Sequence, residues 1–234
     1  MDRSLLSIDW DYFICIKNRY FGSYIENKTT TVDLWYKRYL QLKKSGKSIY
    51  KYFQLSTDYN RFWEKIKKIF TFDNKVKTYV SDSHALSYCI AKDFNCNTVY
   101  LFDAHSDLGY GSLSFYDFEV NCANWLGKLL VENIIKNAYI IYSPYTFEKP
   151  DDFKYMNHKY QIIYLKPNDL TNNKINISAL HICRSGAWTP PWFDDNFIQF
   201  VNSLGFRYEI IDCPKRKWNT DNLTLSDELY YMLV

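Results

Sequence analysis

Two short stretches carry acidic residues at alternate positions directly after apolar runs. The stretch SIDWD ends in Asp9 and Asp11, and the stretch LFDAHSD contains Asp103, His105 and Asp107. On a strand, alternate residues point to the same side, so each stretch would direct its acidic side chains together. Four carboxylates in one place would repel one another unless cations compensate their charge. The spacing therefore indicates a site for positively charged ions.

A third stretch, TYVSDSHALS, supplies Asp82 and His84 where a predicted strand passes into a helix. With His84 and His105, the acidic stretches would offer six ligands, enough for two divalent ions that share a water and cancel four negative charges. A mixture of carboxylate and imidazole ligands suits Mn²⁺ or Fe²⁺. We therefore expect two Mn²⁺, with Fe²⁺ possible. His84 could instead form a local cap, and Asp82 could be a cap or a partner of a ligand.

The elements that must position these residues alternate between strands and helices. Apolar and β-branched runs predict strands at 5–10, 75–81, 97–103, 137–143, 160–165, 178–183 and 206–212, and amphipathic patterns predict helices at 31–46, 58–70, 83–94, 121–136 and 193–205. This alternation is typical of a three-layer αβα fold with a mainly parallel sheet. We expect one domain over 1–234 with a helical insertion at about 20–74. Such sheets bind ligands at the carboxyl ends of their strands, where the acidic stretches lie.

Composition narrows the class of protein. A net charge of +3 in 234 residues does not indicate nucleic-acid binding, and no apolar run approaches the ~20 residues of a membrane helix. Six cysteines without a CxxC pair, and no signal peptide, predict a cytoplasmic protein with reduced thiols. The aromatic content of 19% fits either an aromatic core and surface or a groove for a peptide. The oligomeric state stays open.

Five blocks together resemble the UPF0489 family of the arginase/ureohydrolase superfamily: SIDWDYF, SDSHAL, LFDAHSDLGYG, NCANWL and ICRSGAWTPPW. The resemblance implies an arginase/deacetylase-like fold with a dinuclear manganese cluster. The positions that match the six ligands are Asp9, Asp11, His84, Asp103, His105 and Asp107. Some bacterial members are peptide arginases, which convert arginine residues of ribosomally made peptides to ornithine. The partner implied here is an arginine-containing precursor peptide.

The order of the motifs departs from that of arginases acting on free arginine. In those enzymes the DxD segment follows DAHxD and continues to a third aspartate, whereas here it comes first and Ile14 stands at the third position. This order suggests a circular permutation of the same sheet. The proton-shuttle histidine, the guanidinium-binding glutamate and the signatures that recognise a free α-amino acid have no clear counterpart. These departures favour an arginine presented within a peptide.

Three residues are candidates for catalysis. Asp107 matches the carboxylate that hydrogen-bonds the bridging hydroxide, so it would orient the nucleophile and pass a proton to the departing amine. His181 lies in the apolar stretch SALHIC and is either a core histidine or a proton shuttle. Glu119 could pair with a guanidinium, or it could be a solvated loop charge.

The main candidates for binding the substrate are Asn121, Asn124, Trp188 and Asp194, and two further residues could assist them. Asn121 and Asn124 lie where polar contacts are expected, although a helix cap also explains Asn121. Trp188, with Trp192 beyond two prolines, could form an aromatic wall for a peptide or a buried helix entry. Asp194 could bind the guanidinium or cap the helix that follows it. Arg184 could meet a substrate carboxylate or a structural aspartate.

The function expected from these features is metal-dependent hydrolysis of the guanidinium of peptide arginine, giving ornithine and urea. One alternative is another ureohydrolase activity, on free arginine, agmatine or a formimino compound. Another is a zinc deacetylase-like amidohydrolase, in which Asp11 and His84 would be unexplained. The last is a non-catalytic, metal-stabilised protein that binds peptides.

Overall fold

A computed structural model describes residues 3–17, 31–110, 119–170 and 174–233. Its centre is a seven-stranded sheet in the order β7-β6-β5-β1-β8-β4-β9, in which every neighbouring pair is parallel. The strands are β1 (Ser4–Asp9), β4 (Phe70–Ser81), β5 (Thr98–Asp103), β6 (Asn137–Tyr142), β7 (Gln161–Leu165), β8 (Ile175–Cys183) and β9 (Glu209–Asp212). The expected parallel sheet is confirmed.

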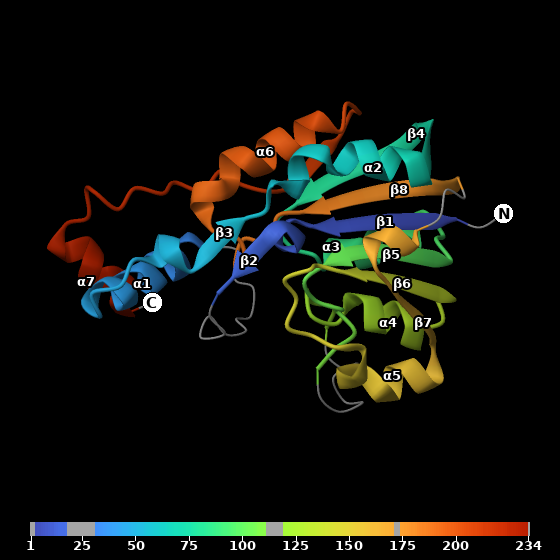
Figure 1. The fold of residues 1–234 in the computed structure, drawn as a ribbon, viewed down its shortest axis with the longest axis horizontal. Helices are drawn as coiled ribbons and strands as arrows, with labels where there is room; N and C mark the ends of the chain where they lie inside the picture. The colour runs from blue at the N-terminus through green and yellow to red at the C-terminus, as the bar shows by residue number, and fades with distance from the viewer. Residues whose placement is uncertain (1–2, 18–30, 111–118, 171–173, 234) are drawn as a thin grey trace.

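Helices cover both faces of this sheet (Figure 1). On one face α2 (Phe62–Ile69) and α6 (Asp194–Ser203) pack on side chains of β1, β5 and β8. On the other face α3 (Leu86–Asp93), α4 (Trp125–Val131) and α5 (Lys154–Lys159) pack on the opposite side chains of β1, β5 and β6. The three-layer α/β fold predicted from the sequence is therefore confirmed.

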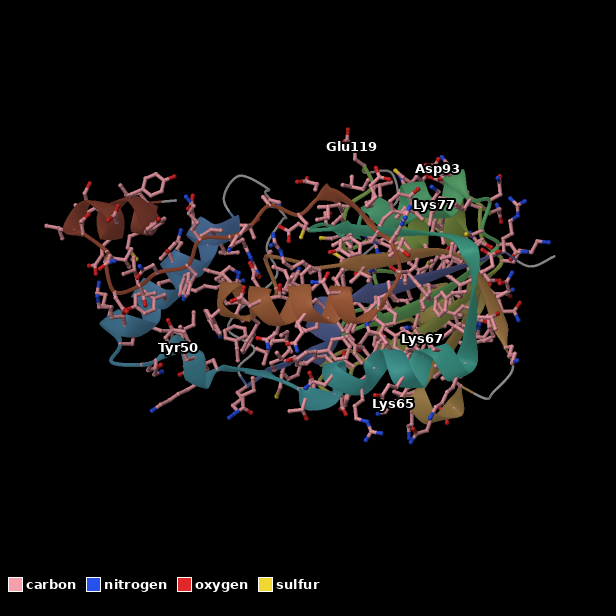
Figure 2. All side chains as sticks on the ribbon, turned by 90° about the horizontal axis from the view of Figure 1, so that it is seen from above. Tyr50, Lys65, Lys67, Lys77, Asp93 and Glu119 are labelled. Atoms are coloured by element: carbon pink, nitrogen blue, oxygen red, sulfur yellow. The ribbon has the colours of Figure 1, made fainter. Side chains whose placement is uncertain are left out.

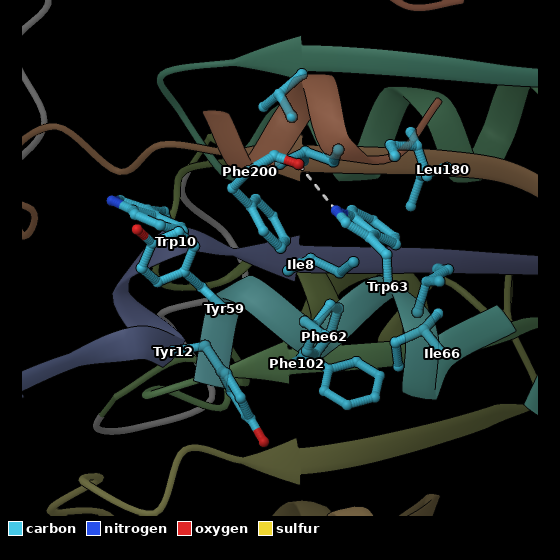
Figure 3. Packing of buried hydrophobic residues seen from close by; sticks show 14 of the residues in the cluster. Ile8, Trp10, Tyr12, Tyr59, Phe62, Trp63, Ile66, Phe102, Leu180 and Phe200 are labelled. Atoms are coloured by element: carbon cyan, nitrogen blue, oxygen red, sulfur yellow. Dashed lines mark hydrogen bonds between the residues drawn. The ribbon is translucent and has the colours of Figure 1, made fainter. Parts of the chain in front are cut away.

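The face under α2 and α6 is built largely from aromatic rings (Figure 3). Trp63 stacks on Phe200 with ring centroids 5.0 Å apart, and its indole N–H donates to the Phe200 carbonyl at 2.9 Å. Trp10 contacts Tyr59 and Phe197 edge-on in the same cluster. Each such buried ring contributes about 2–3 kcal/mol of transfer free energy. Much of the unusual aromatic content thus lies in the core.

Several element boundaries differ from those expected. The helix predicted over 58–70 is a 3₁₀ turn followed by α2, and β4 begins at Phe70, five residues before the predicted start. Phe70 is buried and pairs with Ile175 of β8, so tertiary packing extends the strand backwards. The helix predicted over 121–136 is shortened to α4. The 3₁₀ turns span Trp10–Phe13, Ile49–Lys51, Thr57–Arg61, Pro150–Phe153, Pro167–Asp169 and Pro191–Phe193.

The predicted helical insertion at 20–74 is only partly helical, and residues 18–30 lie outside the described chain. It contains α1 (Thr31–Lys44) and α2, but also β3 (Phe53–Leu55), which pairs antiparallel with β2 (Ile14–Ile16). A further helix, α7 (Leu225–Leu233), was not predicted and lies beside α1 at the end of the molecule away from the sheet (Figure 1). α1 ends in Lys43 and Lys44, which suit the negative end of the helix dipole.

Among the described residues, no helix combines the length and apolar character needed to cross a membrane. Within the described ranges, no disulfide joins any two of the six cysteines.

Candidate metal centre

The carboxyl ends of three strands bring the acidic stretches together. Asp9 and Asp103 are the last residues of β1 and β5, which lie next to each other in the sheet. Asp11 follows in the 3₁₀ turn after β1, and His84 stands between β4 and α3. Strand ends that are distant in sequence thus meet at one edge of the sheet, as the parallel topology requires.

His84 is the centre of a first group of ligands. Its Nδ1 atom lies 3.2 Å from Oδ2 of Asp9, 3.0 Å from Oδ2 of Asp103 and 2.9 Å from Oδ2 of Asp107. The imidazole is only 1% exposed and the three carboxylates are buried with it. Asp9, His84 and Asp103 place one atom each close enough together to hold a metal ion.

A second group is formed by Asp11, Asp103 and His105, which could also hold a metal ion. Nδ1 of His105 lies 2.9 Å from Oδ2 of Asp11 and 3.6 Å from Oδ1 of Asp103. Asp103 belongs to both groups and directs a different oxygen to each imidazole. The six predicted ligands therefore lie together in two groups that share one carboxylate.

Three of the facing atoms have no hydrogen-bond partner: Nδ1 of His84, Oδ2 of Asp103 and Oδ2 of Asp11. They are buried, and they lie about 3 Å from groups of the cluster without hydrogen-bond geometry. Leaving buried polar atoms unsatisfied is costly, whereas a cation would satisfy all three. The donor set of oxygens and nitrogens thus fits divalent cations.

The electrostatics of the cluster point the same way. Burial, and then the nearby Asp11, raises the pKa of Asp9 to about 6. Burial and the three neighbouring carboxylates hold the pKa of Asp103 well above its usual range. For His84 and His105, burial opposes the charged form, but the adjacent carboxylates outweigh it and raise both pKa values. Without a cation the cluster would therefore retain protons that ions would replace.

Backbone amides and one hydroxyl orient the carboxylates. Oδ1 of Asp9 accepts from the N–H of Asp11 at 2.9 Å, and the Ser185 hydroxyl donates to Oδ2 of Asp9. Oδ1 of Asp11 accepts from the N–H of Ala104 at 3.1 Å. Oδ1 of Asp103 accepts from the N–H of His105 at 2.7 Å. These bonds fix the carboxylates before any ion binds.

Asp107 is held in an uncommon backbone conformation, with φ of 50°. Its carbonyl accepts from the N–H groups of Leu126 and Gly127 at 3.2 and 3.1 Å, and its Oδ2 accepts from the indole N–H of Trp125 at 2.6 Å. Ser185, the hydroxyl partner of Asp9, has the same φ. Positive φ values at non-glycine residues concentrate at functional sites.

Trp188 lies against the more accessible side of the centre. Its ring centroid is 5.0 Å from that of His105, and the ring is half-buried. The His105 side chain is 29% exposed, so the centre opens on this side. Trp192 instead packs between Trp35 and Tyr50, which places it in a separate buried cluster. Of the two tryptophans, Trp188 borders the candidate centre and Trp192 does not.

The predicted contacts around residue 120 serve the loop before α4. Asn124 accepts from the N–H of Asn121 at 2.8 Å and donates to the carbonyl of Glu119 at 3.1 Å, while Asn121 accepts from the N–H of Ala123 at 2.9 Å. The Glu119 side chain is exposed and directed outward (Figure 2). The structure supports the local readings of Glu119 and Asn121, and these two hydrogen bonds of Asn124, which the sequence assigned to substrate contacts, lie within the same loop.

Asp194 binds guanidinium groups, but they belong to the chain itself. Its carboxylate accepts from Nη1 of Arg184 at 3.3 Å and from Nε of Arg216 at 3.0 Å. Arg184 also donates from Nε to Oδ1 of Asp82 at 2.6 Å. Asp194 therefore has a structural role in pairing these two arginines, and these contacts give no support to its binding a substrate guanidinium. Of the alternatives for Arg184 and Asp82, the structure supports the structural pairing.

His181 is fully buried within β8, and both ring nitrogens are hydrogen-bonded to serines. Of the two readings of His181, this environment supports the core histidine and gives no support to the proton shuttle. The reason is its register: His181 lies beside Ser7, two positions before the strand end.

Sequence reasoning missed Glu148, which follows β6. It accepts from the N–H of Ser106 at 2.8 Å and from the Tyr110 hydroxyl, and its carboxylate thereby fixes the loop that carries His105 and Asp107. Burial raises the pKa of Glu148. The only signal was its place shortly after a strand end.

Comparisons with family models, curated proteins and solved structures give no match for this chain.

Proposed function

We propose that this protein is a metal-dependent hydrolase that uses two divalent cations, Mn²⁺ in the first instance. The observation that carries the proposal is the shared carboxylate of Asp103, which stands between two Asp/His groups whose facing atoms lack hydrogen bonds. Asp9 and His84 would complete one ligand set, and Asp11 and His105 the other. Asp107, within 2.9 Å of Nδ1 of His84, would join the first.

The chemistry that two divalent cations supply when bound is activation of a water molecule for attack on an electrophilic carbon. Asp107 would accept a proton from that water and deliver it to the departing amine, because its carboxylate borders the first group and the Trp125 N–H fixes its orientation.

The substrate class we propose is the arginine side chain within a peptide. Addition of water to the guanidinium carbon and cleavage of its bond to Nε would give ornithine and urea. The motif blocks that resemble peptide arginases support this choice. Trp188 supports it further, because an aromatic face beside the accessible His105 suits a planar cation.

A non-catalytic peptide-binding protein is the second candidate. It is favoured by one observation: of the predicted guanidinium-binding carboxylates, Asp194 is paired internally and Glu119 faces outward. A mononuclear zinc amidohydrolase is less well supported, because Asp11 and His84, which belong to the two groups, would then have no purpose.

The proposed function is tested by incubating Mn²⁺-loaded protein with arginine-containing peptides and following peptide mass and released urea. We expect loss of CH₂N₂ from the peptide with an equal amount of urea. Urea released from free arginine or agmatine but not from peptides would contradict peptide arginine as the substrate and would show that the enzyme acts on small guanidino compounds. No turnover of any guanidino compound, despite bound metal, would favour the peptide-binding candidate.

A further inference from the structure

A buried series of hydrogen-bonded side chains begins at Nε2 of His84, the ring nitrogen that does not face the carboxylates. Nε2 of His84 lies 2.7 Å from Oγ of Ser7, and Ser7 lies 2.7 Å from Oγ of Ser87 on α3. All three side chains are buried. Ser7 precedes Asp9 by two residues on β1, so both point to the same side of the sheet. The strand that presents one ligand of the centre therefore also supports another.

This series of hydrogen bonds continues from Ser87 to His181 on β8. Oγ of Ser87 lies 2.6 Å from Nδ1 of His181, and Nε2 of His181 lies 2.8 Å from Oγ of Ser81. The Ser81 hydroxyl donates to the backbone carbonyl of Ser83 at 2.8 Å. The members between His84 and this carbonyl are here called the serine–histidine chain: Ser7, Ser87, His181 and Ser81.

The Ser83 carbonyl at the far end sets the donor and the acceptor of every hydrogen bond in the serine–histidine chain. A carbonyl only accepts hydrogen bonds, so the Ser81 hydroxyl must donate its single hydrogen to the Ser83 carbonyl. Its oxygen then accepts from Nε2–H of His181. His181 is fully buried and both of its ring nitrogens face serine hydroxyls and not carboxylates, so this imidazole is neutral. A neutral ring protonated at Nε2 has an unprotonated Nδ1, which must accept from the Ser87 hydroxyl.

The same reasoning carries the direction back to the centre. Because Ser87 donates to His181, it accepts from the Ser7 hydroxyl. Because Ser7 donates to Ser87, it accepts from Nε2–H of His84. The nitrogen of His84 left to face Asp103 and a cation is then Nδ1, the atom that lies 3.0 Å from Oδ2 of that aspartate. The opposite direction would leave Oγ of Ser81 and the Ser83 carbonyl 2.8 Å apart with no hydrogen between them.

We propose that the serine–histidine chain fixes His84 in the tautomer that carries hydrogen on Nε2 and so presents its Nδ1 lone pair to the metal centre. The chain ends on a carbonyl that cannot take up a proton, so its members position His84 and do not conduct protons. This inference rests on the metal centre of the proposed function but not on its substrate.

The direction of the chain can be observed in the metal-free protein at pH 8 by long-range ¹H–¹⁵N NMR of ¹⁵N-labelled histidine. The protein has four histidines. The signals of the exposed His158 are identified because they disappear in His158→Gln, and the ¹H–¹⁵N couplings within each remaining ring show which of its nitrogens is protonated. We expect His181 to be protonated at Nε2 and not at Nδ1. A His181 protonated at Nδ1, or one exchanging between tautomers, would overturn the proposal.

The consequence for metal binding is measured by Mn²⁺ titration. Ser7→Ala and Ser87→Ala should each weaken Mn²⁺ affinity by about tenfold or more, whereas Ser4→Ala, a buried serine of β1 outside the chain, should stay within about twofold of the unsubstituted protein. Equal affinities in all three variants would contradict the proposal. If the unsubstituted protein bound no Mn²⁺, the proposed function would fall, while the NMR experiment would still decide the direction.

Discussion

Asp103 directs its two carboxylate oxygens to two different imidazoles, with Oδ2 3.0 Å from Nδ1 of His84 and Oδ1 3.6 Å from Nδ1 of His105. Because the same residue ends β5 in the middle of the sheet, its position is set by pairing with β1 on one side and β6 on the other. The two ligand groups are thus built around a rigid strand end, which fixes the spacing of the ions they would hold.

Substitutions at the shared and unshared ligands should have different effects on metal content. Asp103→Ala should abolish binding at both groups, whereas Asp11→Asn should remove one ion and leave the other, because only Asp103 serves both. Metal per chain, measured by mass spectrometry after Mn²⁺ loading and desalting, checks this. The exposed Asp93→Asn is the control. Equal metal content in the two ligand variants would contradict the shared carboxylate.

The metal-free protein should lose stability as the pH rises from about 4 to 6. Burial, and then Asp11, raises the pKa of Asp9 to about 6 in the folded chain. A carboxyl whose folded-state pKa is raised contributes stability below its unfolded pKa and loses it as the pH passes the folded value, here on the order of 3 kcal/mol. The raised pKa values of His84 and His105 extend the loss above about 6.5.

Thermal unfolding of the metal-free protein from pH 4 to 8 measures this dependence. Asp9→Asn cannot titrate at this position, so its profile should be flatter between pH 4 and 6. Mn²⁺ should raise the melting temperature more at pH 8 than at pH 5.5, because the ligands must be deprotonated to bind it. Parallel pH profiles for the two metal-free proteins would show that Asp9 has an ordinary pKa.

The two tryptophans around the double proline should behave differently. Trp188→Ala should lower kcat/KM for a peptide by roughly tenfold with little change in metal content, because the ring faces His105 at the open side. Trp192→Ala should lower the melting temperature instead, since that ring packs among Trp35 and Tyr50. Steady-state kinetics and thermal unfolding separate the two. Unchanged peptide kinetics in Trp188→Ala would remove this residue from the substrate site.

Gly186 is required by the close approach of the loop after β8 to Asp82. A Cβ at this position would lie 2.7 Å from Oδ2 of Asp82, the carboxylate whose other oxygen binds Arg184. Gly186→Ala should therefore destabilise the protein by about 1–3 kcal/mol, measured by denaturant unfolding. The exposed Ser45→Ala should change stability by less than about 0.5 kcal/mol. A Gly186→Ala variant as stable as this control would show that the loop can move away.

The clustering of the Asp and His side chains could be predicted from the sequence because their spacing and their places at strand ends are local features. Asp9, Asp103 and His84 each follow an apolar strand, and parallel topology then dictates that such ends meet. Asp194 could not be assigned in this way. Its neighbours Arg184 and Arg216 lie elsewhere in the chain, and only the folded loop reveals that they occupy its carboxylate.

The residues that hold His84 in place could not be predicted from the sequence either. Ser7 and Ser87 lie 80 positions apart, and nothing in their local sequence distinguishes them from other serines. His181 was recognised as a candidate, but its function depends on the depth of its position in β8, which register decides. The antiparallel pair of β2 and β3, and the helix α7, were missed because short, irregular segments depend on tertiary contacts more than on periodicity.

The central claim is that two cations bind on either side of Asp103. Anomalous X-ray diffraction at the manganese edge, from crystals grown with Mn²⁺, tests it most directly. The account predicts two anomalous peaks, one among Asp9, His84 and Asp103 and the other among Asp11, Asp103 and His105. A single peak, or none between these side chains, would contradict it.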